Sequence, residues 1–73
     1  MAITLEQAKA LRPGMVLHHA TKRNADGTPQ RWMVNGQPKV WARTPTRVYV
    51  PLKHGLYTYD CLTENTISMV NLA

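Results

Sequence analysis

Hydrophobic residues recur at helical spacing over the first eleven positions of the chain. The members of this apolar face are Leu5, Ala8 and Leu11. Thr4 and Gln7 have the spacing of a capping box, in which each side chain bonds to the backbone amide of the other residue. Pro13 lacks a backbone donor and disfavours helical geometry at the residue before it. The pattern therefore predicts a short helix over about residues 4–11, followed by a turn at Pro13-Gly14.

The hydrophobic period shortens at residue 15, where a strand-like run begins and continues to residue 20. A polar, turn-rich stretch over residues 22–29 separates this run from the next one. Two further apolar runs flank Asn35-Gly36, a dipeptide that tolerates the positive φ angles of a type I′ turn. We therefore predict a hairpin that joins residues 30–34 to residues 37–43. Pro38 cannot donate a ladder hydrogen bond, so its strand is expected at a sheet edge or at a bulge.

Side-chain alternation assigns the residues of this predicted hairpin to two faces. One face receives Trp32, Val34, Gln37, Lys39, Trp41 and Arg43. The other face receives Arg31, Met33, Pro38, Val40 and Ala42. The first face therefore combines both tryptophans of the chain with two cations.

A second hairpin is predicted over residues 47–62, with its bend near Gly55. A four-residue loop places Arg47 opposite Asp60, and we prefer it because it keeps both charges outside the core. In that register the buried side receives Val48, Val50, Tyr57, Tyr59 and Cys61. A three-residue loop would instead set Tyr49 beside Tyr59 on the exposed side.

The end of the chain predicts a tight helical turn over residues 63–66 and then a final strand. The apolar members of that strand are Ile67, Met69 and Leu72. Together these elements predict a single mainly β domain, with a helix over about 4–11 and a small antiparallel barrel or curled sheet of about five strands over about 15–72. Because a chain of 73 residues buries only about 60% of the surface that its unfolded form exposes, we expect one thin core.

The order of these elements resembles SH3-like barrels such as the KOW and Tudor-type modules. The turn Arg12-Pro13-Gly14 before the first strand and the turn over 63–66 before the last strand carry this resemblance. The Gly-Asp pair that is common at the first turn of KOW motifs is Gly14-Met15 here, which weakens a ribosomal or polymerase-associated interpretation. Residues 47–57 and 24–28 are also similar to small uncharacterised bacteriophage and prophage proteins, which implies a phage or bacterial origin and no defined activity.

Positive charge is concentrated in the middle of the chain. The whole sequence has nine Lys and Arg against four Asp and Glu, a net charge of +5. Residues 21–53 contain seven of these cations and one acid, a net +6, whereas residues 1–20 have a net +1 and residues 54–73 a net −2. A basic block favours a polyanionic partner or an acidic protein surface, although Lys and Arg also form ordinary solvated faces.

The candidate binding face is the aromatic and basic side of the first predicted hairpin. Its central residues are Trp32, Lys39, Trp41 and Arg43, and the residues expected at its margin are Lys22, Arg23 and Lys53. Small β-barrels bind single strands by stacking bases on aromatic rings while cations contact the backbone phosphates. The chain has no Phe, so the alternative is that one or both tryptophans fill the core, which removes base stacking and leaves phosphate contacts.

Residues with metal-binding or catalytic chemistry form no recognisable motif. His18 and His19 are adjacent and point to opposite faces of a strand, and Cys61 has no second cysteine nearby, which disfavours zinc. Cys61 and His54 lack an orienting third group, the four carboxylates are scattered, and no Gly-rich phosphate loop occurs. We therefore expect no enzyme activity, no metal and no cofactor.

A single cysteine suits a reducing cytoplasm, and neither an export signal nor a run of about eighteen apolar residues occurs, so we expect a cytoplasmic protein. The leading hypothesis is a small basic module that binds DNA or RNA through backbone phosphates and aromatic stacking. The alternatives are a protein-interaction module, such as a phage-encoded inhibitor or modulator of a host protein, and a structural protein that self-assembles through the Pro38 edge.

Overall fold

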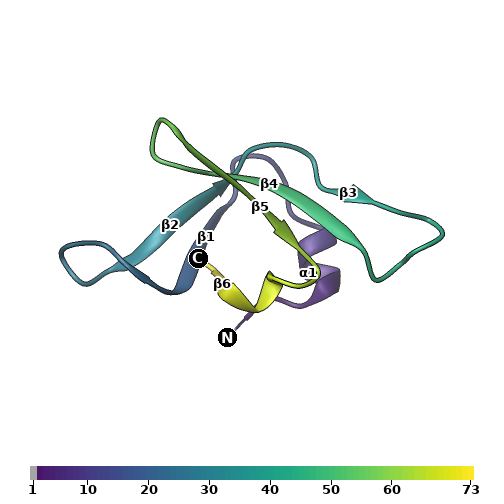
Figure 1. The fold of residues 1–73 in the computed structure, drawn as a ribbon, viewed down its shortest axis with the longest axis horizontal. Helices are drawn as coiled ribbons and strands as arrows, with labels where there is room; N and C mark the ends of the chain where they lie inside the picture. Colours follow the sequence, from purple (N-terminus) through teal and green to yellow (C-terminus); the bar gives the residue numbers. More distant parts are fainter. Residues whose placement is uncertain (1) are drawn as a thin grey trace.

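The computed structural model describes residues 2–73, which form one short helix, six strands and a 3₁₀ turn (Figure 1). The elements in chain order are α1 (Leu5–Lys9), β1 (Val16–Arg23), β2 (Pro29–Val34), β3 (Lys39–Val40), β4 (Val48–His54), β5 (Thr58–Thr63), η1 (Ile67–Met69) and β6 (Val70–Leu72). Within this part of the chain, no helix has the length or apolar character needed to cross a membrane.

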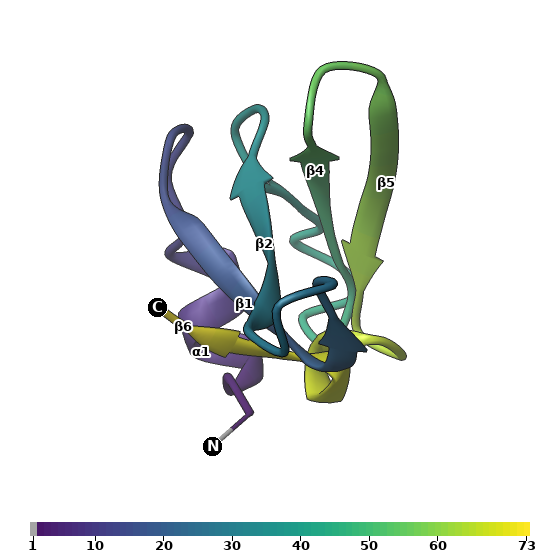
Figure 2. The same cartoon turned by 90° about the vertical axis from the view of Figure 1, so that its left-hand side faces the viewer.

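All six strands belong to one antiparallel sheet that curls without closing. β4 pairs with β5 along one edge, while β2 and β3 share its other edge. β1 lies between β2 and β6, so the order β3-β4-β2-β1-β6 contains every strand except β5. In Figure 2, β2, β4 and β5 run side by side and β6 crosses near their lower ends. The mainly β prediction, with a curled sheet and a short N-terminal helix, is confirmed; no ladder over residues 2–73 joins β5 to β6 to complete a barrel.

The helix begins at the predicted capping box. The Thr4 amide donates to Gln7 Oε1 at 2.8 Å, and the Gln7 amide donates to Thr4 Oγ1 at 3.1 Å. The helix is shorter than predicted, since its last residue is Lys9 and the sequence placed its end near residue 11. Leu11 is nevertheless buried, and Gly14 makes the turn into β1 with a φ of 92°.

The predicted hairpin at Asn35-Gly36 is wrong. β2 pairs with β1 and with residues 52–53 of β4, and β3 pairs with residues 48–49 of β4, so the two strands follow one another along one edge of β4 and do not pair with each other. The Asn35 amide donates to the Pro51 carbonyl at 2.8 Å, and a Cβ added to Gly36 would lie 2.8 Å from Pro51 Cγ. Pairing with the long strand β4 thus overrides the local turn preference, and β3 remains a two-residue edge strand after Pro38.

Loss of that hairpin also overturns its predicted faces. Trp32 and Val34 point into the core and are 5% and 1% exposed, whereas Lys39 is exposed on the opposite side of the sheet. Trp32 and Lys39 therefore do not share a face, since β4 sets the register of both strands independently.

The second predicted hairpin forms, with a register that differs from both alternatives. Its loop is Gly55 to Tyr57, so Leu52 faces Asp60 and Pro51 faces Cys61. Val48 and Val50 are buried as predicted, and the predicted Arg47–Asp60 pair is wrong because Asp60 lies opposite Leu52.

The same shift reverses the orientation of β5. Tyr57 and Tyr59 are 89% and 62% exposed, and Cys61 is half-buried, so their predicted burial is wrong. Leu62 occupies the core position instead, at 2% exposed. The predicted tight turn over 63–66 forms, because the Thr66 amide donates to the Thr63 carbonyl at 3.0 Å. The 3₁₀ turn Ile67–Met69 follows it, and the last strand is reduced to Val70–Leu72.

One face of the sheet and the helix enclose a single core. Its buried members are Ile3, Ala8, Leu11, Leu17, Trp32, Val34, Val48, Val50, Leu52, Leu62 and Val70. Because side chains alternate along each strand, the residues between these positions form a second face that points away from the core. We call this second face, over β2 to β5, the outer face.

Candidate functional site

Cross-strand rows on the outer face bring cations and tyrosines together. In the first row Met33 of β2 pairs with Lys53 of β4, which pairs with Tyr59 of β5. In the second row Lys39 of β3 pairs with Tyr49 of β4. The register of the sheet, rather than the sequence spacing, therefore places one lysine beside one tyrosine twice on the same face.

Each of these lysines lies over the ring of its neighbouring tyrosine. Lys39 Nζ is 5.9 Å from the centroid of Tyr49, and Lys53 Nζ is 5.6 Å from the centroid of Tyr59. Such separations are within the range of cation–π attraction, which contributes about 0.5–1 kcal/mol at exposed sites. Tyr49 and Tyr59 are 37% and 62% exposed, so part of each ring remains open to a ligand. We call these four residues the lysine–tyrosine surface.

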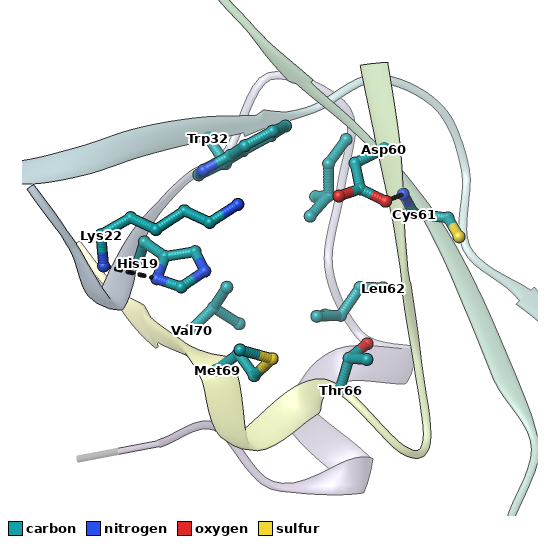
Figure 3. A pocket seen from close by; sticks show the side chains of 10 residues that line it. His19, Lys22, Trp32, Asp60, Cys61, Leu62, Thr66, Met69 and Val70 are labelled. Atoms are coloured by element: carbon teal, nitrogen blue, oxygen red, sulfur yellow. Dashed lines mark hydrogen bonds between the residues drawn. The ribbon is translucent and has the colours of Figure 1, made fainter. Parts of the chain in front are cut away.

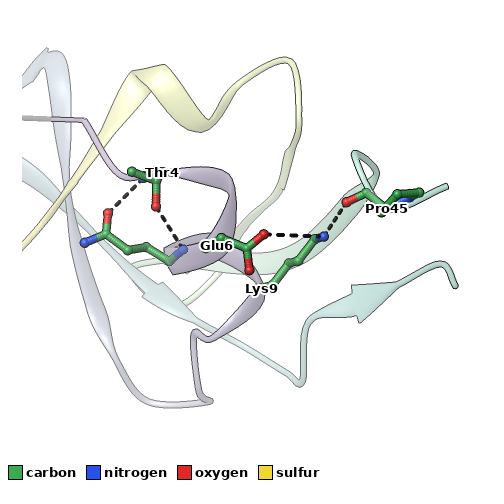
Figure 4. A network of polar contacts seen from close by, with 5 residues as sticks. Thr4, Glu6, Lys9 and Pro45 are labelled. Atoms are coloured by element: carbon green, nitrogen blue, oxygen red, sulfur yellow. Dashed lines mark hydrogen bonds and ion pairs between the residues drawn. The ribbon is translucent and has the colours of Figure 1, made fainter.

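A further cation–aromatic contact lies in the loop between β3 and β4. The guanidinium carbon of Arg47 is 4.4 Å from the ring centroid of Trp41, whose side chain is half-buried. Lys9 of α1 donates to the carbonyl of Pro45 and lies 4.0 Å from Glu6, which ties this loop to the helix (Figure 4). Arg43 is exposed in the same loop, close in sequence to both partners.

The seven predicted site residues fall into separate places. Trp32 lies in the core, where its indole N–H donates to Gln30 Oε1 at 3.0 Å and its ring centroid is 5.0 Å from that of His54. Stacking of a base on Trp32 from the outer face is therefore unavailable, as the alternative interpretation of the tryptophans foresaw. Lys39 and Lys53 belong to the lysine–tyrosine surface.

The other predicted cations lie toward the two ends of the molecule. Lys22 and Arg23 end β1 beside the loop at 24–28, whereas Trp41 and Arg43 lie in the loop over 41–47. Figure 1 shows these two loops at opposite ends of the longest axis, along which the molecule extends 43 Å. The basic block is thus continuous in sequence and divided in space.

Sequence reasoning missed both tyrosines of the surface. The preferred register assigned Tyr59 to the core, whereas the three-residue alternative placed both tyrosines on the exposed side, and neither was chosen as a site residue. The signal that identifies them is alternation outward from the most apolar stretch of β4, in which Val48, Val50 and Leu52 are all buried. That alternation places Tyr49 and Lys53 on the outer face without knowledge of the turn.

On the other side of the sheet, a pocket of about 140 Å³ opens where β5 and β6 remain unpaired (Figure 3). Its lining residues are His19, Lys22, Trp32, Leu52, Asp60, Cys61, Leu62, Thr66, Met69 and Val70. We call it the seam pocket. Trp32, Leu52, Leu62 and Val70 of the core form part of its wall, and its polar groups come from β1, β5 and the turn before η1.

A large bulge in β1 positions His19 at this pocket. His18 pairs with Arg31 and Arg23 pairs with Pro29, so four residues of β1 oppose one residue of β2 between these pairs. The bulge leaves the amides of Thr21 and Lys22 free of the ladder, and both donate to His19 Nδ1, at 3.1 and 2.9 Å. His19 is 8% exposed, and its role as an acceptor for two amides explains why a histidine occupies this buried position.

Burial lowers the pKa of His19 below its usual value of 6.5, and the charge of Lys22 lowers it further. Both causes disfavour the imidazolium form, since a buried charge loses hydration and a neighbouring ammonium repels it. The two amide donors act in the same direction because a protonated Nδ1 could not accept their hydrogen bonds. His19 is therefore neutral at neutral pH.

Over residues 2–73, no group of three or more His, Cys, Asp or Glu side chains lies close enough to hold a metal ion. Comparison of the chain with protein-family models, curated proteins and solved structures finds no match. The functional argument consequently depends on the two surfaces described above.

Proposed function

We propose that this protein is a non-enzymatic nucleic-acid-binding module whose outer face contacts a single strand. The observation that carries the proposal is the repeated lysine–tyrosine pair, Lys39 with Tyr49 and Lys53 with Tyr59, on one face of the sheet. An exposed ring beside a cation supplies the two contacts that single-strand binding requires, a stacking platform for a base and a charge for its phosphate.

The spacing of the two pairs favours a strand over a single nucleotide. Tyr49 and Lys53 are four residues apart on β4, which corresponds to roughly 13 Å at the rise of an extended strand. Two contact points at this separation suit a ligand that repeats its base and phosphate along its length. The net charge of +5 adds a long-range attraction for any such polyanion.

Stacking on the tyrosines tests the proposal most directly. We would titrate dye-labelled single-stranded DNA and RNA octamers at low salt, using fluorescence anisotropy, into wild-type protein and the Tyr59→Ala and Tyr59→Phe variants. Tyr59→Ala is expected to weaken binding by about 1–3 kcal/mol, the usual contribution of one base–aromatic stack. Tyr59→Phe retains the ring and should bind nearly as well as the wild type.

A matched control uses an exposed residue away from this surface. Arg12→Ala, in the turn after α1, removes a cation without touching either tyrosine. It should reduce affinity less than Tyr59→Ala even though it changes the net charge. Absence of any complex at low salt, or equal losses in Tyr59→Ala and Tyr59→Phe, would contradict the proposal.

A protein-interaction module is the second candidate, and the tip of the β4–β5 hairpin favours it. Leu56 and Tyr57 are 73% and 89% exposed at this tip, and exposed aromatic and aliphatic residues are common at the centres of protein interfaces. Affinity capture from a host extract treated with nuclease distinguishes the two functions. A partner protein that survives nuclease and is lost in a Leu56→Ser, Tyr57→Ser variant would favour this candidate over nucleic-acid binding.

A further inference from the structure

The seam pocket has a hydrogen-bond donor that the fold does not use. His19 Nδ1 accepts two backbone amides, so the proton of the neutral ring is on Nε2. Figure 3 shows this second ring nitrogen pointing into the pocket, away from Lys22 N. The His19 side chain is more than nine-tenths buried, so a donor fixed in this way is preorganised for a ligand that carries an acceptor oxygen.

The size of the seam pocket limits what can enter it. Its volume of about 140 Å³ is close to that of an engineered protein cavity of about 150 Å³ that binds one benzene ring. Trp32, Leu62 and Met69 give it apolar walls, which suit the faces of a flat ring. One six-membered ring fills this volume, and a second fused ring would extend out of the pocket mouth.

One side of the pocket mouth is cationic, and the other side is a strand edge whose backbone amides are already hydrogen-bonded. Lys22 lines the pocket, so a phosphate can be neutralised next to a ring bound inside. On the β5 side, the Cys61 amide donates to Asp60 Oδ1 at 2.7 Å and the Thr63 amide donates to Thr66 Oγ1 at 2.9 Å. An added peptide strand would have to displace these bonds, which disfavours closure of the seam by a β-strand.

We propose that the seam pocket binds a single pyrimidine base, with a base carbonyl accepting from His19 Nε2 and the adjoining phosphate contacting Lys22. This inference rests on the proposed function, because it adds a base-selective site to a module that otherwise contacts any strand. It gives Lys22 a role at the pocket, separate from the lysine–tyrosine surface. A purine would leave its second ring outside the pocket, which favours a pyrimidine.

The test compares dye-labelled oligo(dT) and oligo(dA) octamers by anisotropy in wild-type protein and in Met69→Trp, which fills the pocket. The wild type should bind oligo(dT) roughly threefold to tenfold more tightly, the effect of about one net hydrogen bond. Met69→Trp should bring the ratio of the two affinities close to 1. Met15→Trp is the matched control, because Met15 is similarly exposed and lies outside the pocket.

A second variant removes only the unused donor. In His19→Asn, the amide oxygen can still accept from the amides of Thr21 and Lys22, while the second ring nitrogen is gone. This variant should remain folded by circular dichroism and should lose most of the preference for oligo(dT). Retention of the full preference in both Met69→Trp and His19→Asn would overturn the proposal.

The remaining outcomes separate this inference from the proposed function. Equal binding of both octamers by the wild type would overturn the seam-pocket site and leave the outer face as the binding surface. If neither octamer binds, titration with thymidine decides: chemical-shift changes at His19 and Trp32 would support a site for free nucleosides and contradict strand binding. No response to thymidine would overturn both. The seam-pocket site would also be overturned if the protein bound no nucleotide and instead captured a protein whose apolar side chain enters the pocket.

Discussion

The two faces of the sheet use their polar side chains in opposite ways. On the core side, His19 accepts the amides of Thr21 and Lys22, and Glu64 Oε1 accepts the amide of Val48 at 3.1 Å. On the outer face, Lys39 and Lys53 contact tyrosine rings. Neither lysine pairs with a carboxylate, since the ion pair found within residues 2–73 is Lys9–Glu6 on the helix.

This difference separates stability from binding. A polar group that satisfies a backbone amide cannot be removed without leaving that amide unpaired. A lysine over an exposed ring accepts no backbone amide, so its loss changes the surface and leaves the fold intact. Substitutions on the core side should therefore lower the free energy of unfolding, and those on the outer face should change affinity instead.

The largest expected effect contrasts the aromatic residues of the two sides. Trp32→Ala should lower the free energy of unfolding by about 3–5 kcal/mol, because it removes a buried ring from a small core. Tyr59→Ala should change it by about 0.5 kcal/mol or less, as surface substitutions usually do. Urea denaturation followed by circular dichroism measures both. Similar losses in the two variants would break the distinction between the faces.

Glu64 gives an intermediate test on the core side. Glu64→Ala leaves the Val48 amide at the start of β4 without its acceptor, which should cost about 1–3 kcal/mol. Glu64→Gln keeps an acceptor oxygen at the same reach and should recover most of that loss in the same denaturation experiment. A similar loss in Glu64→Gln would indicate that the charge of Glu64, and not its hydrogen bond with the Val48 amide, contributes the stability.

A smaller effect concerns the pH dependence of stability. The folded-state pKa of His19 is lower than its value of 6.5 in the unfolded chain, so the unfolded chain binds more protons below that value. The free energy of unfolding should therefore fall as pH decreases from about 6.5 toward the folded pKa. Denaturation series at several pH values should show a shallower fall in His19→Asn, which accepts the same amides without titrating. An unchanged slope would remove His19 as its cause.

The smallest effect on stability is expected on the outer face, where it accompanies a clear change in binding. Lys39→Ala should reduce the slope of log affinity against log salt by about 1, as expected for one lost phosphate contact. Its free energy of unfolding should stay within about 0.5 kcal/mol of the wild-type value. Anisotropy titrations at several salt concentrations measure the slope. An unchanged slope would exclude Lys39 from the phosphate contacts.

The parts of the fold that depend on local chemistry could be predicted from the sequence. The capping box of Thr4 and Gln7 and the bend at Gly55 involve residues a few positions apart, and both occur. The hairpin at Asn35-Gly36 failed because its competitor, pairing of β2 with β4, joins residues about twenty positions apart in the chain. The bulge in β1 could not be predicted either. An amide within it donates to the side chain of His19, and the alternation pattern treats His19 as a residue of a regular strand.

The candidate site was predicted in composition rather than in arrangement. Lys39 was chosen by alternation in the predicted hairpin and Lys53 as a cation at its margin, and each lies over an exposed tyrosine ring. Their partners were wrongly chosen as tryptophans, because the register of β5 depends on which three residues form the loop after His54. A shift of that loop moves Tyr59 from the core to the surface, and no local signal in residues 53–58 determines it.

The contact of each surface lysine with a tyrosine ring also affects how much a ligand must organise when it binds. A free lysine side chain loses about 0.5–1.5 kcal/mol of rotational freedom when a partner immobilises it. Lys39 and Lys53 already lie over the rings of Tyr49 and Tyr59, so part of that freedom is lost during folding. The entropy of ordering is thereby transferred from the binding step to the folding step, which favours tighter binding at a surface with two lysines.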